Sequence, residues 1–338
     1  MIFLKKFISA GILSAMTGAF LCGCTSGTHK IPSAPMFDET VTTPQVSQAE
    51  IQEQTQSDGT LIEQQDGAYI YDKIATLTNT EFDECNQYAK MLNERYLLNT
   101  AVVITDDLQG MEAEAYAAKV YNELFNGMGS GMVFLVNNAT QSDILYKSGQ
   151  CQRFIDEVSE RDELYHATKE LVVGNYKEAI LIMLKLGEKC PMNVVDNTDM
   201  FSEEMAEEFS NSLDECANSV TLVATNNISE VSNEELARNY YDRRYANEAG
   251  YLVLMDKKSR SVTAVTQGEL PAEIAEFVSA ANQTAANNDF IGAANRIVSG
   301  FGGVPLTISV PDETETEYTE EDAENAEYTE YSDEEETE

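Results

Sequence analysis

Cysteine and histidine are the residue types here that could do nucleophilic, redox or metal chemistry. The 338-residue sequence holds only six cysteines and two histidines, His29 and His166. Two isolated histidines leave little for a histidine-rich metal site or a Ser-His-Asp triad. The four cysteines after residue 24 also lack C-x-x-C spacing, so they predict neither a zinc site nor a thioredoxin-like redox role. These four are Cys85, Cys151, Cys190 and Cys216.

The first 24 residues indicate the compartment. Two lysines precede an apolar run over 7–21, which is too short and too rich in Gly and Ser for a typical spanning helix. The run ends in Leu21-Cys22-Gly23-Cys24, which resembles the bacterial lipoprotein signal. By this resemblance residues 1–23 are a signal peptide, and Cys24 carries the lipid that holds the protein at the extracytoplasmic face of the cell membrane. The alternative is an ordinary secretory signal with an incidental cysteine.

Outside the cytoplasm the four remaining cysteines can form disulfides, in three possible pairings. Cys85 and Cys216 fall on the inward faces of predicted helices, where buried thiols are expected. Cys151 and Cys190 are the favoured disulfide pair, because both belong to the same predicted domain.

The charge of the chain restricts its partners. The sequence has 59 acidic against 21 basic residues, a formal charge of −38. The phosphates of a nucleic acid or an anionic lipid surface would repel such a chain, so neither is predicted to bind it electrostatically. With 43% hydrophobic residues, the chain can still bury real cores.

Both ends of the sequence read as unfolded segments. Residues 24–66 are rich in Ser, Thr, Gln, Glu and Pro without a sustained apolar period, which predicts a flexible tether. Residues 311–338 hold a dense run of Asp and Glu without Lys or Arg, which predicts a disordered acidic tail.

Two blocks between these ends show the same order of predicted elements. In each block an amphipathic helix, an apolar strand, a second helix and a glycine lead into another apolar strand and a hairpin. Two further helices close each block, at about 153–173 and 175–189 in the first. The pattern predicts the α/β class, with two tandem sandwiches at 67–190 and 196–308, each a mixed sheet of about four strands covered by helices.

The segment between the blocks includes Asp196-Asn197-Thr198-Asp199, which loosely resembles a calcium loop. It lacks the central glycine and the closing acid that such a loop needs. An interdomain linker is therefore favoured.

The order of motifs in both blocks resembles the TPM domain family, known from a thylakoid-lumen phosphatase, photosystem-repair factors and bacterial envelope proteins. The resemblance is close over 67–190 and looser over 196–303. The residues that carry it in the first block are Asp72 before Leu77-Thr78, Ala115-Tyr116-Ala117 before Leu124-Phe125, Gly131 before a strand, Asp156 after Gly149, and Gly174-Asn175-Tyr176.

The resemblance implies either phosphate-ester hydrolysis or binding of a divalent cation by acidic loops. Asn175 stands where the family has an aspartate, and the second block keeps Asp289 without clear counterparts of Asp72 or Asp156. We therefore name no catalytic residue and no required cofactor. Asp72 and Asp156 are the candidate ligands for Ca²⁺, with helix capping as the alternative.

The hypothesis that follows is a lipid-anchored, non-enzymatic interaction or assembly module of the cell envelope. Its expected partners are the membrane, through the lipid at Cys24, and an unidentified envelope protein. A divalent-metal-assisted phosphatase in the first block is the alternative. A solute-binding lipoprotein is a weaker third, since no hinge pair is evident.

Overall fold

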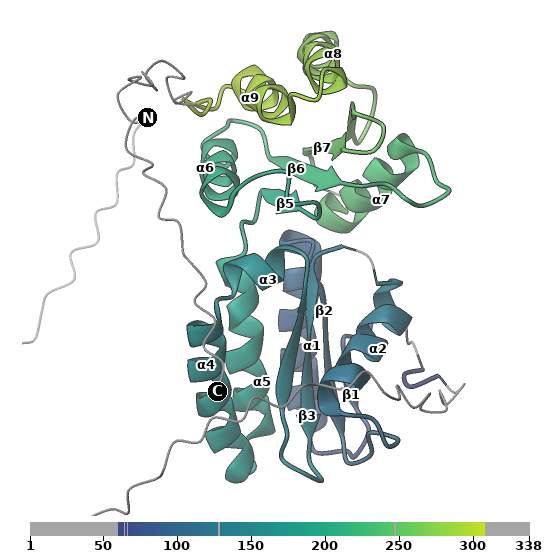
Figure 1. The fold of residues 1–338 in the computed structure, drawn as a ribbon, viewed down its shortest axis with the longest axis vertical. Coiled ribbons are helices and arrows are strands. Elements are labelled where there is room, and N and C mark those ends of the chain that lie inside the picture. Colours follow the sequence, from purple (N-terminus) through teal and green to yellow (C-terminus); the bar gives the residue numbers. More distant parts are fainter. Residues whose placement is uncertain (1–59, 64, 66, 128, 247, 308–338) are drawn as a thin grey trace, which may run out of the picture. The chain divides into compact units, whose positions relative to one another are not determined.

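The computed structural model describes residues 60–63, 65, 67–127, 129–246 and 248–307, and its described helices and strands form two α/β lobes (Figure 1). The predicted signal peptide, Cys24, nearly all of the tether and the acidic tail lie outside these residues. No helix in the described part is both long and apolar enough to span a membrane.

The first lobe, residues 67–190, holds a four-stranded sheet in the order β1-β2-β3-β4. Its first three strands are parallel and β4 is antiparallel to β3. Its elements are β1 (Ile70–Asp72), α1 (Asn79–Arg95), β2 (Asn99–Thr105), α2 (Ala113–Phe125), β3 (Gly131–Asn137), β4 (Ile144–Ser148), α3 (Gln150–Phe154), α4 (Glu157–Val172), α5 (Tyr176–Lys185) and the 3₁₀ turn η1 (Leu186–Lys189).

The second lobe, residues 193–307, repeats the strand order and the strand directions of the first in β5-β6-β7-β8. Its elements are β5 (Val194–Asp196), α6 (Glu203–Asp214), β6 (Val220–Thr225), α7 (Asn233–Tyr245), β7 (Tyr251–Asp256), β8 (Ser261–Thr266), α8 (Ala272–Ala286) and α9 (Phe290–Gly300). The predicted α/β class with two mixed four-stranded sheets is confirmed.

Both sheets are covered on both faces, as their nearly uniformly apolar central strands require. In the first lobe α2 packs on one face, where Val103 and Leu135 point, and α1 and α5 pack on the other. In the second lobe α7 covers the face that carries Val223 and Leu254. The opposite faces of the two sheets share one continuous apolar cluster, to which Phe154 of α3 also belongs.

Two local features of the helices and strands differ from the sequence-based expectations. The helix expected at 153–173 is interrupted at Asp156, which has extended backbone angles and caps α4. Residues 194–196 form β5, which ends at Asp196, the first residue of the predicted linker 196–199. A strand of three residues is too short to show an apolar period, so it resembles linker in the sequence.

The end of the predicted tether is also docked on the first lobe. Leu61 and Ile62 are only 4% and 3% exposed and join the apolar cluster under α2. The Glu123 carboxylate accepts hydrogen bonds from both of their N–H groups, at 2.8 and 3.2 Å. Lys73 Nζ donates to the Leu61 carbonyl at 2.6 Å. These contacts hold residues 61–62, which precede β1, against the first lobe. We call these two residues the clamp.

Candidate functional site

The Asp72 loop, residues 72–77, lies where β1 ends and before α1 begins. The Asp72 carboxylate accepts hydrogen bonds from its own loop: the N–H of Ile74 at 3.3 Å, the hydroxyl of Thr76 at 3.2 Å and the N–H of Leu77 at 2.8 Å. This carboxylate therefore shapes the loop that leads into α1. Helix α1 then starts with a capping box between Thr78 and Glu81.

The second lobe contains the same loop, at residues 196–201. The Asp196 carboxylate accepts from Thr198 N–H at 2.9 Å, from the Thr198 hydroxyl at 3.1 Å and from Phe201 N–H at 2.9 Å. The two backbone donors lie two and five residues after the aspartate, as they do after Asp72. Asp196 is thus the counterpart of Asp72. The sequence alone favours a linker at Asp196 and does not reveal this equivalence.

Further hydrogen bonds of the two lobes match. Asn86 Oδ1 of α1 accepts from Tyr69 N–H at 2.8 Å, and Ser210 Oγ of α6 accepts from Asn193 N–H at 3.1 Å. The hydroxyls of Tyr121 and Tyr241, both on second helices, donate to the backbone carbonyls of Gly129 and Glu248. The common topology therefore extends to side-chain bonds that fix the helices to the sheet.

The Asp196 loop is the place where the first lobe docks on the second. Arg153 of α3 donates through Nη2 to the Asp196 carbonyl and through Nη1 to the Phe201 carbonyl, both at 2.9 Å. Its Nη2 also lies 3.4 Å from the fully buried Asp196 carboxylate. Gln150 Oε1, also on α3, accepts from Asp196 N–H at 3.1 Å. One guanidinium thus holds both ends of the loop and its carboxylate.

A second arginine joins the lobes from the other side. Arg243 of α7 donates to the Asn93 carbonyl at 2.6 Å and to Asn99 Oδ1 at 2.8 Å. Burial lowers the pKa of Arg243, because removing the guanidinium from water disfavours its charged form. Ser130 and Asn197 add a hydrogen bond of 2.6 Å between the lobes. Together with the shared apolar cluster, these contacts fix the lobes as one unit.

Asp72 and Asp156, the candidate calcium ligands, lie at opposite ends of the first sheet. Asp72 ends β1, whereas Asp156 follows α3 beyond the amino end of β3. The Asp156 carboxylate accepts from Ser159 N–H at 2.9 Å and pairs with Lys189 at 3.3 Å. The hydrogen bonds from Ser159 lower the pKa of Asp156. A calcium site at either residue stays a prediction, and the two carboxylates do not converge on one ion.

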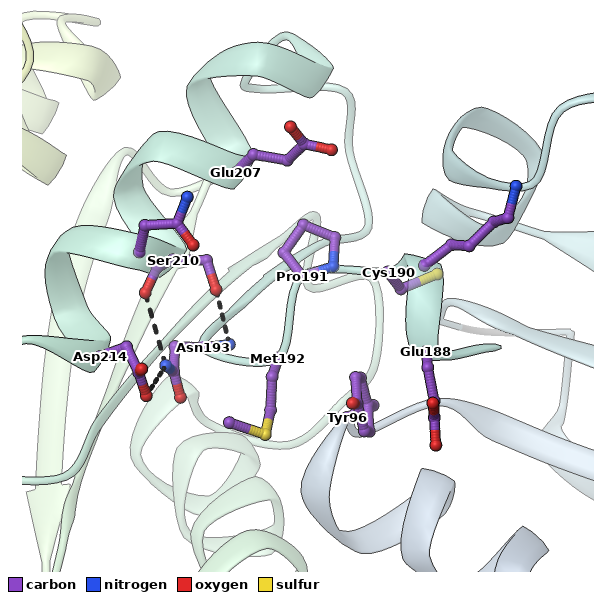
Figure 2. Close-up of a pocket in the computed structure, with 11 residues that line it drawn as sticks. Tyr96, Glu188, Cys190, Pro191, Met192, Asn193, Glu207, Ser210 and Asp214 are labelled. Atoms are coloured by element: carbon purple, nitrogen blue, oxygen red, sulfur yellow. Dashed lines mark hydrogen bonds between the residues drawn. The ribbon is translucent and has the colours of Figure 1, made fainter. Parts of the chain in front are cut away.

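A cavity with a volume of about 320 Å³ lies along residues 188–193, which link the two lobes. Figure 2 shows the residues that line it. Three carboxylates line it, Glu188, Glu207 and Asp214, against a single lysine, Lys189, so its lining is negative overall. Asn193, at its floor, donates through Nδ2 to Asp214 at 3.5 Å. This acidic lining would repel a phosphate ester. Among the described residues, no group of three or more His, Cys, Asp or Glu is arranged to hold a metal ion.

The favoured disulfide pair lies beside the α3 contact. The sulfur atoms of Cys151 and Cys190 are 3.7 Å apart, and both side chains are buried. The hydrogen bond between the thiols and their burial raise the pKa of Cys151. Desolvation likewise raises the pKa of Cys85 to about 12, so Cys85 is an inert buried thiol rather than a nucleophile.

We expect Cys151 and Cys190 to form a disulfide in protein isolated from an oxidising compartment, because only a small shift brings their sulfurs to the bonding distance of about 2.05 Å. Peptide mapping by mass spectrometry without reduction should recover the two cysteines in one linked species. The Cys151→Ser variant is the control and should leave Cys190 free to react with an alkylating agent. A disulfide between Cys85 and Cys216 instead would contradict the prediction.

Comparisons with known proteins bear on the first lobe. Residues 70–186 match the model of the TPM domain family, and the match ends before the second lobe begins. The solution NMR structure of the N-terminal domain of a protein from P. gingivalis is similar, with a TM-score of 0.33 and 12% identity over 36% of this chain and 82% of that chain. The N-terminal domain of the cg2496 protein from Corynebacterium glutamicum has a TM-score of 0.31 and 10% identity, over 38% and 84%. No curated protein matches the chain.

Proposed function

We propose that this protein, whose residues 70–186 match the TPM domain family, is an interaction or assembly module of the cell envelope and not an enzyme. In this proposal it is lipid-anchored at Cys24 on the extracytoplasmic face, and its second lobe is a divergent TPM-like repeat. The matched strand order, aspartate loops and helix-fixing bonds support the repeat.

The observation that carries the proposal is the use of the acidic loop in the second lobe. There Asp196 and its loop bind a guanidinium and a carboxamide of a neighbouring lobe. In both lobes the aspartate oxygens also accept from the N–H and hydroxyl groups of their own loop. In the second lobe, the loop after the first strand therefore makes a contact with another lobe, which supports an interaction role.

A metal-assisted phosphatase in the first lobe is the second candidate, favoured by the family match and by Asp72. To separate the two, the purified full chain is assayed on a generic phosphomonoester with and without Ca²⁺ or Mg²⁺. We expect the wild-type protein, with either metal present, to hydrolyse the ester no faster than the Asp72→Ala variant does. Asp107→Ala is the matched control, because Asp107 follows β2 and is largely exposed. Metal-dependent hydrolysis that Asp72→Ala abolishes and Asp107→Ala keeps would establish the enzyme.

The anchoring part of the proposal has its own test. Mass spectrometry of the native amino-terminal fragment should show a chain that begins at Cys24 and carries acyl groups. A mature chain that begins elsewhere, without acyl groups, would contradict lipid anchoring while leaving the interaction role intact.

A further inference from the structure

The Asp72 loop and the Asp196 loop are built alike, but only the Asp196 loop holds an arginine in the described structure. We propose that the Asp72 loop, together with the open edge of β1, is a docking site for a partner protein that presents an arginine on a helical turn. This inference rests on the proposed function, because it names the chemistry of the partner that the module would bind.

The occupied loop shows what the ligand must supply. Arg153 spans the carbonyls of Asp196 and Phe201 and lies against the Asp196 carboxylate. Gln150, three residues earlier on the same short helix, accepts the Asp196 N–H. At the edge of β5, the N–H and carbonyl groups of Asp196 are therefore hydrogen-bonded to side chains of α3 rather than to another strand. A carboxamide at position i−3 and an arginine at position i make this contact, and the Arg153 Nε also lies 3.1 Å from the Asp199 carboxylate.

The first lobe offers counterparts of the two carbonyls and of the Asp196 carboxylate without that cover. Ala75 stands where the second lobe has Asp199, whose carboxylate lies 3.1 Å from Arg153 Nε. The counterparts of the two bound carbonyls belong to Asp72 and Leu77, since the hydrogen bonds that shape the two loops match. Strand β1 is at the edge of its sheet and pairs only with β2. Within the described residues no Lys, Arg or His forms an ion pair with Asp72, whereas Asp196 has Arg153.

A cavity lies at this edge. Its volume is about 320 Å³. Its lining includes Ile70 and Asp72 of β1, Phe82 of α1, Ile62 of the clamp, and one acid and one base, Glu63 and Lys73. The Lys73 ammonium is directed to the Leu61 carbonyl and the Tyr116 hydroxyl. In the second lobe the position of Phe82 is taken by Ala206, which is fully buried. The first lobe thus keeps open space beside its loop, with an apolar wall for the stem of a long side chain.

Charge and geometry define the partner. A guanidinium has a planar fork that can reach two carbonyls and a carboxylate together, which an ammonium cannot do. The formal charge of −38 also favours the approach of a basic surface. A second copy of this chain is a poor candidate, because Gln150 and Arg153 of each copy already hold their own second lobe, and the second lobe has no helix between β8 and α8. The partner is therefore a different protein.

The probe for this site is a peptide with the sequence of residues 147–158, which includes α3. It carries Cys151→Ser and is held as a helical turn by a side-chain lactam. It is titrated into the isotope-labelled full chain, and amide chemical shifts are followed by NMR. We expect saturable shifts at residues 70–77 and at Phe82. Arg153→Lys in the peptide should weaken binding about tenfold, since the fork is lost, and Arg153→Gln should abolish it.

Changes in the protein complete the test. Asp72→Asn, which retains an acceptor for the loop N–H groups, should weaken binding about tenfold, whereas Asp107→Asn should bind like the wild type. The peptide series does not depend on how any protein variant folds. Equal binding of the arginine and glutamine peptides, shifts confined to other surfaces, or no shifts at millimolar peptide would overturn the site. Phosphatase activity without loss of peptide binding would instead overturn the proposed function alone.

Discussion

Replacing Arg153 by alanine should lower the free energy of unfolding of the full chain by about 3 kcal/mol, because it leaves the buried Asp196 carboxylate without its cation. The variant also loses the two bonds to the carbonyls of Asp196 and Phe201. Denaturant unfolding followed by circular dichroism measures the change. Arg153→Lys should recover less than half of the loss, since a lysine cannot bind both carbonyls.

Arg161→Ala is the matched control for this variant. Arg161 forms an ion pair with Asp162 at 3.6 Å, but its side chain is 72% exposed. Pairs of this kind contribute about 0–1 kcal/mol, so this variant should unfold almost as the wild type does. Equal stability of the Arg153→Ala and Arg161→Ala variants would show that the lobes do not depend on the guanidinium.

Replacing Gly131 by alanine should destabilise the first lobe by about 3 kcal/mol or more, because the new methyl group has no space. A Cβ atom at Gly131 would lie 2.1 Å from the backbone carbonyl oxygen of Asn99 on the adjacent strand. That neighbour is main chain of the central sheet, so it cannot rotate away as a side chain could. Thermal unfolding of the purified variant measures the effect.

Gly268→Ala serves as the control, since no atom lies within 4 Å of a Cβ placed there. It should change stability by less than about 0.5 kcal/mol. Equal stability of the Gly131→Ala and Gly268→Ala variants would contradict this prediction. It would mean that β2 and β3 can separate at their amino ends, where Gly131 lies close to the Asn99 carbonyl in the structure.

The sequence predicts most of the fold because its long apolar strands and amphipathic helices carry periods that local patterns reveal. The class, the two mixed sheets and the order of elements follow from these patterns. The short strand β5 does not, since its sequence Val-Val-Asp is too brief to distinguish a strand from a linker. For the same reason the sequence favours a linker at the Asp196 loop, although the spacing of Asp196 from Thr198 and Phe201 matches that of the Asp72 loop.

The candidate site was less predictable than the fold. Asp72 was singled out in the sequence for its acid chemistry, whereas the structure shows that hydrogen bonds to its own loop define its local role. The role of Arg153 depends on a contact with residues more than forty positions away in the chain, for which local sequence carries no signal. Only the second lobe reveals what such a loop can bind.

The clamp at Leu61 and Ile62 has a mechanical consequence. A pull on the chain from its amino-terminal side reaches residues 61–62 before it reaches β1, and there it is resisted by the bonds to Glu123 and Lys73. The edge strand is thereby shielded from tension. Its open side keeps its shape even when the preceding segment is stretched.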